Sequence, residues 1–479
     1  MAYLHGAYGE IGESKVASVT QADVVAAYIG TAPVNLIRGY ADKDLVNMPV
    51  KVTNMSEVQS LVGYSDDWET FTLGSAFAEH FDNTVGNVGP IYIVNVLDPA
   101  VHKSAQKTTK ALTFTDGKAE FESDKIILDT FAIADKAEGV DYALSYTMAK
   151  HTVTVALLKE TDGAELSATF DTVDTSKVQA ADIIGEKTET GEYTGLASVL
   201  NILAAPGWSH IPAVYKAMVS TIQKLNGHWD GFVHADVPLE DKGTKIDTLA
   251  KAQKWAIDNG YTSEFSKVYW PKIKDGNGRI FWLSTVGAAT MQRVDLSHDG
   301  VPFESPSNKE IMATSQYFGE DSKNRGFDQE TANKLNEKGI TTACFWGGRW
   351  VLWGPHTAAY KYNGSMDARA IFDVNIRMLE HITNSFQKDH GTEIDSPMTP
   401  QDKDSVLNFE KEKLDTLLGI GALIGTPSVE FVESANPTSN MLNGDFVWDF
   451  SVTNTPPFKS GTARVCYTDE GFQSFFATE

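Results

Sequence analysis

A thiol and an imidazole share the stretch CFWGGRWVLWGPHTAAY, which runs from Cys344 to Tyr360 and also holds three tryptophans and three glycines. A glycine-rich bend beside Cys344 and His356 could hold a substrate, because a cysteine next to a histidine can act as a nucleophile. A β-hairpin that turns at Gly347-Gly348 and packs on its tryptophans would need the same residues without any chemistry. Cys344 and His356 carry no other mark of activation, so the sequence favours core packing.

His234 and Asp236 form a second candidate at the end of an apolar strand, where α/β enzymes often place catalytic groups. No cysteine, serine or basic residue lies beside them in sequence to complete a catalytic set. The nearest motif to a nucleophile elbow, GWSHI, lacks the second glycine, and its Ser209 is better explained as a helix cap. We therefore predict no catalytic residue, no cofactor and no metal site. An α/β enzyme with an unrecognised site near His234 and Asp236 is the alternative.

The composition is that of a folded and strongly acidic chain of 479 residues. Its 64 acidic residues and 40 lysines and arginines give a formal net charge of −24, which disfavours binding to nucleic acid or to anionic membranes. The two cysteines fit folding in a reducing cytoplasm. We expect no signal peptide, and no membrane insertion, because the longest apolar stretches are far shorter than the ~20 residues that span a bilayer.

Apolar and helical segments alternate along the chain and would position these candidates. Runs of strand length occur at 24–33 and 91–96, and further strands are expected at 231–238 and 446–452. Helices are expected over 72–81, 209–227, 246–259, 366–387 and 401–418. Arg369, Asp373 and Arg377 follow one helix face and could be only a solvated surface. Buried strands that alternate with helices predict an α/β (α+β) layered core.

Residues 98–199 have a different character, because they are rich in Thr, Lys, Asp and Glu and show a period of two. A hairpin is expected to turn at Asp116-Gly117, and two strands with one solvated face should follow it. We predict an all-β surface insertion. The full predicted division is an N-terminal arm at 1–22, a core in two parts at 23–97 and 200–445, the insertion at 98–199 and a C-terminal arm at 446–479.

The stretch 347–363, GGRWVLWGPHTAAYKYN, together with the helix at 367–387, resembles the C-terminal core of contractile tail sheath proteins from phages and phage-tail-like bacteriocins. The likeness continues through FEKEKLDTLLGIGALIG. Three upstream segments also look like sheath segments in the family's order, at 24–33, 202–218 and 300–311. Together these segments touch nearly the whole chain outside the insertion at 98–199, the region in which sheaths vary most. The Trp-Gly stretch is then part of a packed sheath core.

This resemblance implies a structural subunit that assembles with copies of itself into stacked six-fold rings around a tail tube. Such sheaths shorten and widen to drive the tube through a cell envelope. The implied partners are the tube, baseplate and tail terminator proteins, with no nucleic acid. The chain would be made in the bacterial cytoplasm and assembled in a phage tail or tail-like particle released by lysis. A baseplate or other component of the same particle is a further alternative.

A helical polymer needs head-to-tail contacts that survive subunit rotation, and extended arms that add strands to a neighbour's sheet can provide them. The second arm contains a Pro-Pro hinge at 456–457 and a further expected strand at 463–468, ARVCYT. The predicted arm residues are Val16, Val19, Phe446, Trp448, Phe450, Val465 and Tyr467. Lys411 and Lys413, on the charged helix, are the predicted contacts with the tube.

Overall fold

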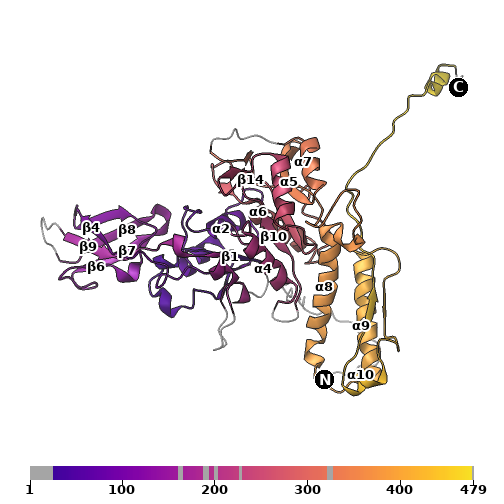
Figure 1. Cartoon of the computed structure of the whole chain (residues 1–479), viewed down its shortest axis with the longest axis horizontal. Helices are drawn as coiled ribbons and strands as arrows, with labels where there is room; N and C mark the ends of the chain where they lie inside the picture. The colour runs from indigo at the N-terminus through magenta and orange to yellow at the C-terminus, as the bar shows by residue number, and fades with distance from the viewer. Residues whose placement is uncertain are drawn as a thin grey trace, which may run out of the picture.

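The computed structural model describes residues 25–159, 166–186, 194–198, 203–225, 229–320 and 327–476. One mixed sheet runs through the main body and joins distant parts of the chain (Figure 1). Ala204 connects its two halves, because it bridges Tyr28 on one side and His234 on the other. The strand order is β2 (Pro49–Val52), β3 (Ile91–Asn95), β1 (Ala26–Gly30), Ala204, β10 (Val233–Asp236), β13 (Ser266–Tyr269), β17 (Ile340–Trp346) and β18 (Arg349–Trp353).

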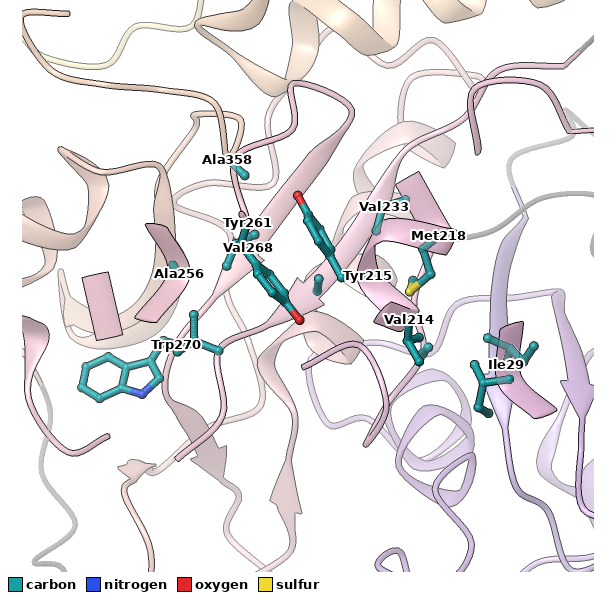
Figure 2. Packing of buried hydrophobic residues seen from close by; sticks show 14 of the residues in the cluster. Ile29, Val214, Tyr215, Met218, Val233, Ala256, Tyr261, Val268, Trp270 and Ala358 are labelled. Atoms are coloured by element: carbon teal, nitrogen blue, oxygen red, sulfur yellow. The ribbon is translucent and has the colours of Figure 1, made fainter. Parts of the chain in front are cut away.

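Helices cover both faces of this sheet, as strands that are apolar on both faces require. Val268 and Trp270 belong to the core cluster that contains buried residues of α4 (Pro212–Ile222), α5 (Leu249–Asp258) and α7 (Gln329–Asn336). Figure 2 shows Val268 and Trp270 in the cluster to which Tyr215 of α4 and Ala256 of α5 also belong. Tyr269, between them in sequence, packs with residues of α2 (Gly74–Phe81) and α6 (Leu283–Leu296) on the opposite face. The predicted α/β mixture of helices and sheets is confirmed.

Shorter elements surround this body. They are α1 (Met55–Leu61), the ribbon of β11 (Glu240–Asp241) and β12 (Thr244–Lys245), and a small sheet of β15 (Ile280–Phe281), β14 (Lys272–Lys274) and β16 (Ser315–Tyr317). Within the described ranges, no helix combines the length and apolar character needed to cross a membrane.

A β-rich part projects from the main body and has its own hydrophobic cluster (Figure 1). The first of its two sheets is β4 (Thr108–Leu112), β9 (Leu166–Phe170) and β6 (Ala132–Ile133); the second is β5 (Lys118–Glu122), β8 (Thr152–Leu157) and β7 (Tyr142–Thr147). The tight turn at Asp116-Gly117 is present, with φ values of 52° and 73°. The strands on either side of it separate, however, because β4 pairs with β9 and β5 pairs with β8. The predicted single hairpin is therefore wrong beyond its turn.

Two long helices and a short sheet form a separate unit beside the main body (Figure 1). It contains α8 (Asp373–His390), α9 (Pro400–Gly419), α10 (Thr438–Leu442) and the antiparallel pair β19 (Ser428–Glu430) and β20 (Asp449–Ser451). Thr399 and Asp402 form a capping box at the start of α9, and Pro400 occupies its first turn. This helix matches its prediction within one residue at each end.

Four local predictions fail for physical reasons. Ser209 does not cap α4, since the cap residue is Ile211 and the Ser209 hydroxyl bonds elsewhere. Helix α8 begins at Asp373 and not near 366, because Phe372 has extended backbone. The interval 98–199 is not all β, because it contains α3 (Ala180–Ile184). Residues 463–468 form no strand in the part of the chain that the structure describes.

Candidate functional site

The stretch at 344–360 forms the predicted hairpin and contributes to the hydrophobic core. Strands β17 and β18 pair antiparallel across Gly347 and Gly348, whose φ values of 61° and 85° suit the twist of a two-residue turn. Cys344 is fully buried opposite Val351, and burial raises the pKa of its thiol to about 12. A thiol with so high a pKa stays protonated and is a poor nucleophile at neutral pH. This arrangement supports the packing interpretation of the stretch.

His356 is held by stacking and by one backbone hydrogen bond. Its ring lies 3.5 Å from that of Tyr360, centroid to centroid, and its Nδ1 is 2.8 Å from the carbonyl oxygen of Ile371. Burial lowers the pKa of His356 to about 4, so the ring is neutral at pH 7. A neutral Nδ1 at this distance from a carbonyl must donate its hydrogen. The imidazole therefore fastens the segment after β18 to the residues before α8.

His234 and Asp236 are deep inside the protein and serve as structural anchors. The His234 Nδ1 lies 2.7 Å from the Tyr269 hydroxyl, and the His234 side chain is 0% exposed. Asp236 accepts hydrogen bonds from the Ser209 hydroxyl at 3.1 Å and from the Ser284 backbone N–H at 2.9 Å. Because Ser284 lies in the first turn of α6, the carboxylate also meets the positive end of that helix.

The burial of this pair does not suit catalysis, because His234 and Asp236 are 0% and 2% exposed and out of reach of a substrate. Burial lowers the pKa of His234 well below its ordinary value and raises the pKa of Asp236 to about 6. Ser209 does lie close to this pair, but its hydroxyl bonds to the Asp236 carboxylate, and the His234 imidazole bonds to Tyr269. The geometry therefore offers no support for the enzyme alternative at His234 and Asp236.

Two ion pairs, one of them fully buried, connect α8 to the main body, and no local pattern in the sequence predicts them. Lys267 of β13 lies 2.6 Å from Asp373, and both side chains are fully buried. Arg377 pairs with Asp295 of α6, and both of these side chains are also mostly buried. The idea that Asp373 and Arg377 belong to a solvated face is therefore wrong. Only Arg369 of that set is exposed, and it pairs with Glu264.

The predicted C-terminal arm divides into a docked part and an extended part. Phe446, Trp448 and Phe450 are partly buried, and the last two pack on the cluster between α8 and α9. The docked part continues to Thr455, whose backbone N–H donates to the carbonyl of Ala422 at 3.1 Å. The first ten residues of the predicted arm therefore belong to the folded unit of their own chain.

Beyond Thr455 the chain leaves the α8 and α9 unit as an extended tail (Figure 1). Val465 and Tyr467 lie in this tail and are 92% and 85% exposed. The corresponding N-terminal positions, Val16 and Val19, lie outside the described residues. The exposed apolar side chains of the tail can contribute to stability only by contact with another surface.

The two lysines predicted to touch a tube differ in their surroundings. Lys413 is tied to its own chain, with its Nζ 2.6 Å from Asp389 and 2.8 Å from the Ser385 hydroxyl. Lys411 is exposed on α9 and shares its face with Asp404 and Asp415, which are also exposed. Lys411 is thus the better placed of the two for contact with another protein.

No protein-family profile matches this chain, but curated relatives match it along its length. The tail sheath protein of Burkholderia phage BcepMu is 27% identical over 502 aligned residues, which cover 98% of this chain and 97% of that protein. The tail sheath protein of Escherichia phage P2 is 24% identical and covers 60% of this chain and 71% of its own length.

Solved structures show the same fold. A chain from the baseplate of the anti-feeding prophage aligns with 98% of this chain at a TM-score of 0.56 and 14% identity. A chain from the contracted sheath complex of the extracellular contractile injection system PVC aligns with 99% at a TM-score of 0.54 and 13% identity. By sequence along nearly its whole length, and by fold, this chain is related to the contractile tail sheath proteins.

Proposed function

We propose that this chain is the structural subunit of a contractile tail sheath. The observation that carries the proposal is the match to a tail sheath protein over 98% of this chain and 97% of that relative. In this proposal, copies join head to tail as stacked six-fold rings around an inner tube, because a non-closing contact produces a helix. Contraction of the rings drives the tube through a target cell envelope, and baseplate and tail terminator proteins hold the two ends.

The arms are the proposed connections between copies. We place them at residues 1–22 and 456–479, since residues 446–455 are docked on their own chain. The 21 described residues 456–476 can span up to about 69 Å at ~3.3 Å per residue, enough to reach a neighbouring copy. We propose that the segment with Val465 and Tyr467 adds a strand to the short β19–β20 sheet of another copy, as Val16 and Val19 would in the other arm.

The β-rich part and α9 have proposed positions in the assembly. The sheets β4–β9–β6 and β5–β8–β7 project from the main body, which suits a surface insertion on the outside of the sheath. Helix α9 faces the tube in this proposal, with Lys411 as a contact. Reversal of this charge in Lys411→Glu should reduce co-sedimentation with the tube protein, whereas the same change at exposed Lys388 of α8 should not.

Electron microscopy of the purified chain over a concentration series tests the proposed function. We expect hollow striated tubes of constant diameter, alone or with the tube protein added, in numbers that rise steeply with concentration. Discrete particles at every concentration, or material that binds only at one end of the tube, would contradict a sheath and favour a baseplate role.

A further inference from the structure

The end of the C-terminal tail carries a compact group of exposed aromatic rings. Phe472, Phe475 and Phe476 lie in or next to the final described turn, Glu470–Phe475, and are 57%, 79% and 86% exposed. The rings of Phe472 and Phe475 stack with their centroids 6.1 Å apart. We call these three residues the aromatic knob. Contiguous apolar surface of this kind marks a contact site, because leaving it in water is unfavourable.

The α8 and α9 pair carries an apolar groove on the surface. The groove has a volume of about 380 Å³, which lies within the range of about 300–1,000 Å³ for ligand pockets. Its apolar lining consists of Ile382, Phe409, Leu414 and Leu417, and we call it the α8–α9 groove. Trp448, beside β20, and Phe450, within it, contact Phe386 and pack against the cluster that includes Ile382, Leu414 and Leu417. Phe409 is 46% exposed and is the apolar residue of the groove that remains open to a partner.

Two charged residues of the groove lining, Glu410 and Lys413, already have partners. Glu410 is 1% exposed and lies 2.8 Å from the Nε2 of His390 and 3.3 Å from the Nζ of Lys413. The Lys413 ammonium also lies 5.6 Å from the centroid of the Phe409 ring. An apolar occupant would therefore cover satisfied ion pairs without leaving a buried charge alone, which would be the costly outcome.

We propose that the aromatic knob of one copy fills the α8–α9 groove of a second copy. The proposal rests on the sheath function and adds an attachment separate from the strand at 463–468. The occupant is proposed to be a second copy, because the tail leaves the folded unit at Pro456-Pro457 and runs away from α8 and α9 of its own chain (Figure 1). The 17 residues from Thr455 to Phe472 span up to about 56 Å at ~3.3 Å each. Buried aromatic anchors of this kind typically dominate protein contacts.

A disulfide trap in full-length chains tests this contact. One tagged copy carries Phe409→Cys, a differently tagged copy carries Phe475→Cys, and both carry Cys466→Ser to remove the exposed tail thiol. Cys344 is fully buried and can stay. The matched control replaces Phe409→Cys by Leu418→Cys, which is also apolar and partly exposed but lies nine residues along α9, on its opposite side.

We expect mixed copies to form the 409–475 disulfide at least tenfold faster than the 418–475 control. Equal rates at the two positions, or no disulfide between the two tagged copies, would overturn the proposal. Folding of each variant is checked by its melting midpoint. As a second measurement, Phe475→Ser should weaken association of full-length copies at least tenfold, and an unchanged association would count against the knob.

The trap also separates this proposal from the sheath function, because it reads a contact between dilute copies and needs no tube. A fast 409–475 disulfide in a chain that never forms tubes supports the knob contact and contradicts the sheath. Tubes that form normally without this disulfide contradict the knob contact and leave the sheath intact.

Discussion

A buried ion pair joins α8 to the main body. Lys267 and Asp373 are fully buried 2.6 Å apart, and Asp373 also accepts a hydrogen bond from the Ser305 hydroxyl at 3.0 Å. A lone charge at such a site costs far more than the pair itself contributes. These residues come from β13, α8 and the loop after α6, so the pair fixes three distant segments at one point.

Replacing one residue of this ion pair should therefore lower the free energy of unfolding much more than replacing both. We expect Lys267→Met to lower the free energy of unfolding by roughly 3–5 kcal/mol, because Asp373 is then buried without a counter-charge. The double variant Lys267→Met with Asp373→Leu should recover at least half of this loss. Urea unfolding followed by tryptophan fluorescence gives both values, and a double variant that is as unstable as the sum of its single changes would contradict this account.

The buried His356 should make stability depend on pH in the acidic range. Its pKa is about 4 in the folded chain and about 6.5 in an unfolded one, so the unfolded chain binds a proton first as the pH falls. The free energy of unfolding should fall between pH 6.5 and pH 4 by up to ~1.4 kcal/mol per pH unit from this residue. His356→Phe keeps the ring stacking and removes the titrating group. The difference in free energy of unfolding between the original protein and this variant should therefore shrink or reverse as the pH falls toward 4.

At the scale of elements, the sequence pattern predicted those helices and turns that are determined by residues close together in the chain. The capping box at Thr399 and the glycine corner at Gly347-Gly348 are complete within a few residues, so α9 and the β17–β18 hairpin could be predicted. Asp116-Gly117 predicted the turn but not the pairing of the strands beside it, because β4 pairs with β9, whose residues lie more than fifty positions away. The start of α8 was missed for a related reason, since Phe372 is held extended by contacts with His356.

The hairpin corner gives a prediction at this scale. Gly347 has a φ of 61°, which asparagine tolerates and β-branched residues do not. We expect Gly347→Asn to change the free energy of unfolding by less than ~1 kcal/mol and Gly347→Val to lower it by roughly 1–3 kcal/mol. Thermal unfolding of the two variants checks this, and equal midpoints would show that the turn does not constrain β17 and β18.

At the scale of the whole molecule, the sequence was informative about family and uninformative about sites. The five segments that carry the resemblance lie in the main body and in α8 and α9, where core packing restricts residue types. The pairing of Lys267 with Asp373, or of Ser209 with Asp236, depends on approaches across more than twenty-five residues and leaves no local pattern. The extended C-terminal arm is also shorter than the predicted 446–479. The alternation of apolar and polar residues at Trp448 and Phe450 is typical of a strand docked on its own chain as well as of a strand donated to a neighbour.

Removal of the tail should not harm the folded chain. Residues 456–476 are mostly exposed, with the Lys459 ammonium over the Tyr360 ring as a peripheral contact. A chain that ends after Thr455 should therefore keep its melting midpoint within about 2 °C of the full chain, since surface changes alter stability little. A much larger fall, measured by scanning calorimetry, would mean that the tail stabilises its own chain.

The most direct test of the sheath account compares these two chains by negative-stain electron microscopy at equal concentration. The account predicts long hollow tubes from the full chain and only dispersed, folded subunits from the chain that ends after Thr455. Tubes of equal length and number from both would contradict a sheath held together by its C-terminal arm. The absence of tubes from the full chain, even with the tube protein present, would contradict the sheath itself.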